Sequence, residues 1–132
     1  MYDIVPEILK NILNNTGSGS KDLDFASIPI DKYLSADTLL KRAFSCHSSG
    51  DIIQAEKLYL SLIKLEYKDP RVYSNLGTIY QNTGRPLEAE AYYKKSIEIE
   101  PGYLGSYNNI SLLLKSQNRT KEAVFWINKA IE

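Results

Sequence analysis

Residues 70–103 read PRVYSNLGTIYQNTGRPLEAEAYYKKSIEIEPGY, and the small and aromatic positions of this stretch return 34 residues earlier and 34 residues later. Alanine holds one of these positions in all three copies, at Ala55, Ala89 and Ala123. Glycine or asparagine holds another, at Gly50, Gly84 and Asn118. A period of this length is typical of repeats that each form a helical hairpin and bury their apolar faces against one another. The sequence therefore predicts an all-α protein built from stacked helix pairs.

Each predicted repeat contains two helices joined by a short turn. The repeats span residues 36–69, 70–103 and 104–132, and the third is shorter than the other two. Glycine and asparagine at the turns tolerate the left-handed backbone of a helix end. Pro70 and Pro86 lie in first turns, where a missing N–H breaks no hydrogen bond. Apolar residues at helical spacing predict helices over 36–48, 52–65, 70–83, 86–99, 104–117 and 120–131.

The middle repeat resembles the tetratricopeptide family at its signature positions: Tyr73, Leu76, Gly77, Tyr80, Gly84, Ala89, Tyr93, Ser96 and Pro101. The first repeat departs from the pattern, with Arg42 and Ala43 in place of the Leu-Gly pair and Cys46 in place of the second tyrosine. The resemblance implies a right-handed α-solenoid of antiparallel helix pairs, in which a small residue such as Gly77 lets two helices approach closely. It also implies a non-catalytic scaffold for protein–protein interaction, with a protein or peptide as its partner.

Residues 1–35 lie outside the repeats. Apolar residues at helical spacing predict an additional amphipathic helix over residues 3–14: Val5, Ile8, Leu9, Ile12 and Leu13. A Gly/Ser-rich linker and an extended lead-in segment follow, and Ser35 is predicted to cap the next helix. The segment is interpreted either as a cap over the first repeat or as a tethered helical ligand that lies in its own groove or a neighbour's.

The composition argues against several classes of partner. Lys plus Arg and Asp plus Glu number 16 each, so the chain has no net field to attract nucleic acid or anionic lipid. Cys46 is the only cysteine and has no partner for an internal disulfide. No basic N-terminal run precedes an apolar stretch, and no apolar run reaches the length of about 20 residues that spans a membrane. The expectation is a cytoplasmic protein that binds neither nucleic acid nor membrane.

The resemblance places a binding surface on the inner, concave side, which the first helix of each repeat lines. Carried over by position, the predicted peptide-binding residues are Lys41, Phe44, Arg71, Asn75, Thr78, Gln81, Asn82, Asn108, Asn109, Leu112 and Lys115, with Leu40 and Ser74 beside them. Asn75 and Asn109 are similar to the asparagine ladder of the O-linked N-acetylglucosamine transferases, which would contact a peptide backbone, but they are equally interpreted as ordinary interhelix asparagines. The clamp that holds acidic chaperone tails is not matched, because Leu40 and Phe44 replace its Lys and Asn.

The last predicted helix presents an apolar face with no further helix after it in this sequence. Its candidate interface residues are Val124, Trp126, Ile127 and Ile131. Terminal repeats need a polar cap for solubility. Three alternatives follow: the face pairs with a second copy, it receives a neighbour's N-terminal segment, or it continues into further chain. Self-pairing predicts that Ile127→Glu or Ile131→Glu would convert an oligomer to a monomer.

Catalytic chemistry finds little support in the sequence. Cys46 and His47 are adjacent, and neighbours on a helix point about 100° apart, so they do not form a nucleophile–base pair. Cys46 is instead expected to be a buried structural thiol, and one Cys with one His cannot close a zinc site. We expect no catalytic residue, metal or cofactor. The alternatives to a free scaffold are a substrate-presenting arm of a larger bacterial glycosyl- or sulfotransferase and a homo-oligomeric assembly module.

Overall fold

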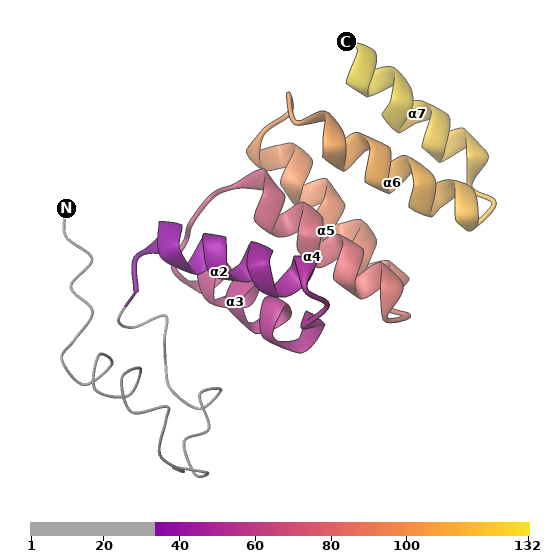
Figure 1. Ribbon diagram of the computed structural model, residues 1–132. Helices are drawn as coiled ribbons and strands as arrows, with labels where there is room; N and C mark the ends of the chain where they lie inside the picture. The colour runs from indigo at the N-terminus through magenta and orange to yellow at the C-terminus, as the bar shows by residue number, and fades with distance from the viewer. Residues whose placement is uncertain (1–33) are drawn as a thin grey trace, which may run out of the picture. The chain divides into compact units, whose positions relative to one another are not determined.

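The computed structural model describes residues 34–132, and every regular element in this range is an α-helix (Figure 1). The helices are α2 (Ala36–Ser48), α3 (Ile52–Lys64), α4 (Pro70–Asn82), α5 (Pro86–Ile99), α6 (Leu104–Ser116) and α7 (Thr120–Ile131). The helix predicted over residues 3–14 lies outside the described residues. The predicted all-α architecture of helix pairs is confirmed.

Three helices end one residue before the predicted position. Leu65, Thr83 and Gln117 still donate their N–H groups to carbonyls four residues earlier, at 3.0, 3.0 and 3.2 Å. Their ψ angles of 2°, 15° and 10° are no longer helical, so each residue is the C-cap rather than the last helical residue. The difference lies within the fraying of any helix end.

Local side chains begin and end these helices as the sequence predicted. The Ser35 hydroxyl accepts a hydrogen bond from the Thr38 N–H at 3.2 Å, and the Asp69 carboxylate accepts one from the Arg71 N–H at 2.9 Å. The predicted turn residues all have positive φ, namely Gly50 at 86°, Gly84 at 80° and Asn118 at 60°. A fourth positive φ, 59° at Glu66, was not predicted, because glutamate has no special preference for this conformation.

The structure divides into two compact units, residues 1–65 and 66–132, and each is described by itself. In the first unit, α2 and α3 form a helical hairpin whose core side chains are fully buried. These residues are Leu39, Ala43, Ala55, Tyr59 and Leu62. The Tyr59 hydroxyl also contacts His47 Nδ1 at 3.1 Å, so the one histidine of the chain helps to join the two helices.

The second unit contains two hairpins, α4 with α5 and α6 with α7, and α6 packs against both helices of the first hairpin. Gly77 on α4 lies directly under the ring of Tyr93 on α5, so a larger residue at position 77 would separate the two helices. Between the hairpins, Ser96 donates to the Pro70 carbonyl at 2.7 Å and shares a 2.5 Å hydrogen bond with Ser106. This buried polar contact positions α6 on the preceding repeat.

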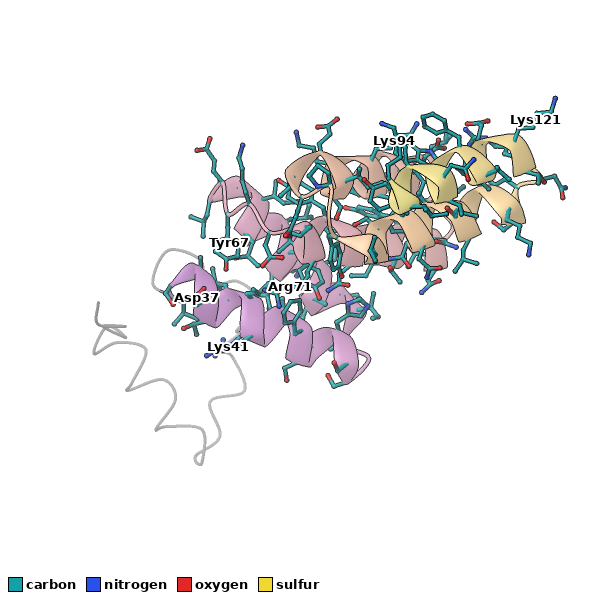
Figure 2. All side chains as sticks on the ribbon, turned by 90° about the horizontal axis from the view of Figure 1, so that it is seen from above. Asp37, Lys41, Tyr67, Arg71, Lys94 and Lys121 are labelled. Carbon is teal, nitrogen blue, oxygen red and sulfur yellow. The ribbon has the colours of Figure 1, made fainter. Side chains whose placement is uncertain are left out.

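An ion cluster fixes the turn between α6 and α7. Arg119 donates to both carboxylate oxygens of Glu90 on α5, at 2.7 and 3.1 Å, and also pairs with Glu122. Lys94, labelled on α5 in Figure 2, pairs with Glu90 at 3.1 Å. The hydrogen bonds from Arg119 hold the pKa of the buried Glu90 carboxyl below its usual value. The cluster therefore links α5 to the hairpin that carries the candidate site. Among the described residues, no helix is long and apolar enough to cross a membrane.

Candidate functional site

A groove with a volume of about 440 Å³ runs along α6 and α7, which lie side by side in Figure 1. Helix α6 contributes Leu104, Tyr107, Asn108, Ser111, Leu112 and Lys115. Helix α7 contributes Ala123, Ile127, Ala130 and Ile131. The groove thus brings together residues that the sequence assigned to two different surfaces, the inner face on α6 and the oligomer interface on α7.

The repeat period explains why this surface is open. Residues of the preceding repeat that stand 34 positions before the lining residues are covered by α6. Ser74, equivalent to Asn108, accepts a hydrogen bond from Asn109 Nδ2 at 2.9 Å, and Ser96, equivalent to Ala130, contacts Ser106. The groove between α6 and α7 is therefore the surface on which the first helix of a following repeat would lie.

The groove is less polar than its covered counterpart. Leu112, Ile127 and Ala130 stand where the preceding repeat has Thr78, Tyr93 and Ser96. The exposed fractions of Leu112, Ile127 and Ile131 are 55%, 47% and 78%, so these apolar side chains leave much of their surface to solvent. An apolar patch of this kind marks a contact site more often than a free surface.

Two of the predicted interface residues lie outside this groove. Trp126 is half-buried, with its ring 6.3 Å from that of Tyr107 and 5.3 Å from that of Phe125. Val124 is exposed but is not among the lining residues. The period could not separate Trp126 from Ile127, because the orientation of a terminal helix depends on the helix it packs against.

Several predicted peptide-binding residues on α4 and α6 already bond within the second unit. The Tyr93 hydroxyl donates to Gln81 Oε1 at 2.8 Å and lies 3.4 Å from the Thr78 hydroxyl, which in turn donates to the Ser74 carbonyl. Asn109 donates to Ser74, and both Asn75 and Asn109 are half-buried. The expectation that both asparagines are fully exposed is therefore wrong, since the neighbouring helix covers part of each side chain.

Other predicted inner-surface residues differ in accessibility. Asn82, Asn108 and Lys115 are exposed, whereas Ser74 is buried at 1% exposure and is unable to meet a ligand. Arg71, labelled in Figure 2, donates to both oxygens of Asp69 at 3.0 and 2.7 Å. This local pair lowers the pKa of Asp69 and engages the Arg71 guanidinium.

On the first unit, the predicted residues are divided in the same way. Lys41 is exposed, and Phe44 is half-buried with its ring 6.3 Å from that of Tyr59. Leu40 is buried at 6% exposure and belongs to the core, which corrects the expectation that it lines the inner surface. Cys46 is half-buried rather than buried. Burial lowers the pKa of His47, which favours its neutral form.

The described residues offer no arrangement typical of a metal centre, since no group of three or more His, Cys, Asp or Glu side chains between residues 34 and 132 is placed to hold an ion. The groove has a different chemical character. Its lining offers apolar contacts, one amide at Asn108, one hydroxyl at Ser111 and one ammonium at Lys115. This composition suits an apolar helix or peptide with few polar groups.

Comparison with known proteins agrees with this architecture. Models of the tetratricopeptide repeat match residues 70–103 and residues 104–132, the ranges predicted for the second and third repeats. No curated protein sequence matches significantly.

Solved structures share the fold. A crystal structure of MamA aligns with a TM-score of 0.68 and 26% identity over 74% of this chain, but the chain spans only 57% of that protein. The TPR2B-domain:pHsp70 complex of yeast Sti1 gives a TM-score of 0.66 at 23% identity, covering 72% of this chain and 76% of that one. The TPR domain of Arabidopsis OM64 gives 0.65 at 18% identity, covering 73% and 79%. With repeat models over residues 70–132 and these shared folds, the chain is a tetratricopeptide repeat protein.

Proposed function

We propose that this chain is a non-catalytic protein-binding module that takes up an apolar helical segment in the groove between α6 and α7. Tetratricopeptide repeats and the matching domain structures support a role in protein–protein interaction. The observation that carries the finer proposal is the groove itself. It repeats, 34 residues later, a surface that a helix already covers within the same unit.

The apolar lining supplies the driving force for such binding. Completing the burial of a half-exposed Leu or Ile side chain contributes about 1 kcal/mol, because full burial contributes about 1.5–3 kcal/mol. Leu112, Ile127 and Ile131 are three such side chains within one groove. Association also costs translational and rotational freedom, so the partner must offer several apolar residues on one face. An amphipathic helix with residues spaced by three and four meets that requirement.

An extended peptide along the inner surface is supported less well. Its predicted polar contacts include Thr78, Gln81 and Asn109, all of which make hydrogen bonds inside the second unit. A ligand would have to replace those bonds rather than add new ones. The exposed residues Asn108, Leu112 and Lys115 belong to both surfaces, so a helix in the α6–α7 groove still uses part of the predicted inner face.

The Sti1 neighbour does not transfer its ligand to this chain. That domain was solved in a complex with pHsp70, but at 23% identity it carries the fold alone. In this chain Leu40 is buried in the core and Phe44 contacts Tyr59, so neither position offers the Lys or Asn of a carboxylate clamp. This supports an apolar ligand over an acidic chain terminus.

The test uses the full chain, tagged, as bait in an extract of its source cells, in three forms. These are the wild type, Ile127→Glu in the groove, and Leu87→Glu as the matched control, since Leu87 is 79% exposed and lies outside the groove. Circular dichroism first establishes that both variants fold. A partner retained by the wild type and by Leu87→Glu should be lost by Ile127→Glu.

Calorimetry with the purified partner should then give an affinity reduced at least about tenfold by Ile127→Glu, which corresponds to about 1.4 kcal/mol. A partner that binds wild type and Ile127→Glu with the same affinity would overturn the proposal.

A further inference from the structure

We propose that residues 3–14 of this chain are a ligand of the α6–α7 groove and bind there as a helix. This inference rests on the proposed function, because it names an occupant for the same groove. It identifies a segment of the chain itself as the apolar helix that the groove is built to receive.

The apolar pattern of the segment matches that of the helix in the equivalent, covered groove. Helix α6 meets the preceding repeat through Ser106 and Asn109, and Ile110, Leu113 and Leu114 complete the face at spacings of three and four. Val5, Ile8, Leu9, Ile12 and Leu13 have the same spacing, with Val5 in the place of Ser106. The segment is also of similar length to α6, which runs from Leu104 to Ser116.

The polarity of the two sides changes together. In the covered groove a serine on α6, Ser106, meets a serine on α5, Ser96. In the open groove the position of Ser96 is held by Ala130, and the position of Ser106 would be held by Val5. A polar pair is thereby replaced by an apolar pair, which avoids a buried hydroxyl without a partner. The register thus predicts contact between Val5 and Ala130.

The charged residues of the segment are compatible with this docking. At about 100° per residue, Asp3, Glu7 and Lys10 fall on the side of the helix opposite Val5, Leu9 and Ile12. Docking through the apolar face therefore buries no charge and leaves all three ionic groups in water. Lys115, the one charged residue that lines the groove, is itself exposed.

The connection permits the segment to reach a groove. Residues 15–34 link it to α2, and a chain of that length spans at most about 70 Å when fully extended. A tether raises the local concentration of a ligand to about the millimolar range, so even modest affinity fills the site. Docking within one molecule would make the segment a competitor of an external partner, and docking between molecules would make it an assembly contact.

The direct test is a disulfide between the two predicted neighbours. In a Cys46→Ser background, which removes the one native cysteine, Val5→Cys is combined with Ala130→Cys. These cysteines take the places of Ser106 and Ser96, whose hydroxyl oxygens are 2.5 Å apart. The control pairs Glu7→Cys, on the opposite side of the segment, with the same Ala130→Cys. Under mild oxidation the first pair should crosslink at least about tenfold faster than the control, as expected for a ligand held near its site.

Gel mobility and peptide mapping of the product distinguish an internal disulfide from a dimer, and either one supports the proposal. Equal rates for the two cysteine pairs, or no crosslink in either, would overturn it. A crosslink between Ala130→Cys residues of two copies would also overturn it, since the end helices would then pair with each other.

A second variant separates this inference from the proposed function. Leu9→Glu should weaken docking of the segment and leave the groove intact, so the external partner should bind it at least as tightly as it binds the wild type. Loss of crosslinking together with a partner still sensitive to Ile127→Glu would refute the segment as ligand and leave the proposed function standing. A crosslink together with a partner insensitive to Ile127→Glu would support the segment and remove the external helix.

Discussion

The ring of Tyr93 on α5 lies so close to Gly77 on α4 that a Cβ atom at residue 77 would overlap its Cδ1 and Cε1 atoms. Tyr93 is 1% exposed and its hydroxyl donates to Gln81, so the ring is held in place from both ends. The contact sets the distance between the two helices of the middle repeat. It also shows why a glycine occurs within a helix, where it otherwise costs about 1 kcal/mol relative to alanine.

Gly77→Leu should destabilise the second unit by about 1–3 kcal/mol or more, because the larger side chain forces the Tyr93 ring out of its site. Urea denaturation followed by circular dichroism measures the change. Gly102→Ala is the control, since a Cβ there would meet nothing within 4 Å. An unchanged midpoint for Gly77→Leu would mean that α4 and α5 do not pack in this register.

Asn109→Ala should cost about 1 kcal/mol, because it leaves the buried Ser74 hydroxyl without the hydrogen bond from Asn109 Nδ2. The neighbouring Asn108 is exposed, so Asn108→Ala should change the unfolding free energy by no more than about 0.5 kcal/mol. Denaturation of the two variants under identical conditions makes the comparison. If both have the same small effect, Asn109 is a surface residue and the asparagine-ladder interpretation gains support.

Glu90 should make the stability of the second unit depend on acid. Its pKa is lowered from 4.5, chiefly by hydrogen bonds from Arg119, so the ionised form stabilises the folded state. That contribution is complete above about pH 4.5, the unfolded value, and is lost as the pH falls through the lower folded pKa.

Glu90→Gln should therefore reduce the unfolding free energy near neutral pH, and the difference from wild type should shrink below pH 4.5. Denaturation curves across this pH range test it, with Glu98→Gln as a control on the exposed Lys95–Glu98 pair. A gap that stays constant with pH would show that the Glu90 carboxylate contributes no ionic stabilisation.

His47 should give the first unit the opposite kind of residue with the same direction of pH dependence. Its pKa is lowered from 6.5 by burial, so the folded state favours the neutral ring beside the Tyr59 hydroxyl. Above pH 6.5 both folded and unfolded states are neutral, and stability is lost as the pH falls below that value because only the unfolded state binds the proton readily.

NMR titration reports this pKa without ambiguity, because the chain has one histidine. The measured value should lie below 6.5, and His47→Gln should abolish the loss of stability in this range. A measured pKa above 6.5 would place the ring in solvent or beside an anion instead.

Much of the local structure could be predicted because its causes are close together in the chain. The helix bounds follow from the 34-residue period and from residues such as Ser35, Pro70 and Asn118, each of which acts on its own turn. The small residue Gly77 was likewise predictable, since the repeat pattern marks a position where helices approach. The bound of α3 was one residue too long only because a C-cap keeps its hydrogen bond after it leaves helical ψ.

The candidate site was predicted only in pieces. Leu112 and Lys115 were placed on an inner surface and Ile127 and Ile131 on an end surface, whereas the structure places all four in one groove. Helical periodicity gives the face on which a residue lies, but not which face of a second helix it joins. That choice belongs to the packing of α6 against α7.

The sequence by itself therefore determined the repeat, the helices and their turns, because period, caps and backbone preference are local properties. Only the tertiary structure decided which polar residues remain available for a partner. Asn109 is engaged by Ser74, and Gln81 by Tyr93, through contacts between residues 35 and 12 positions apart. Such contacts depend on the distance between packed helices, which no single helix specifies.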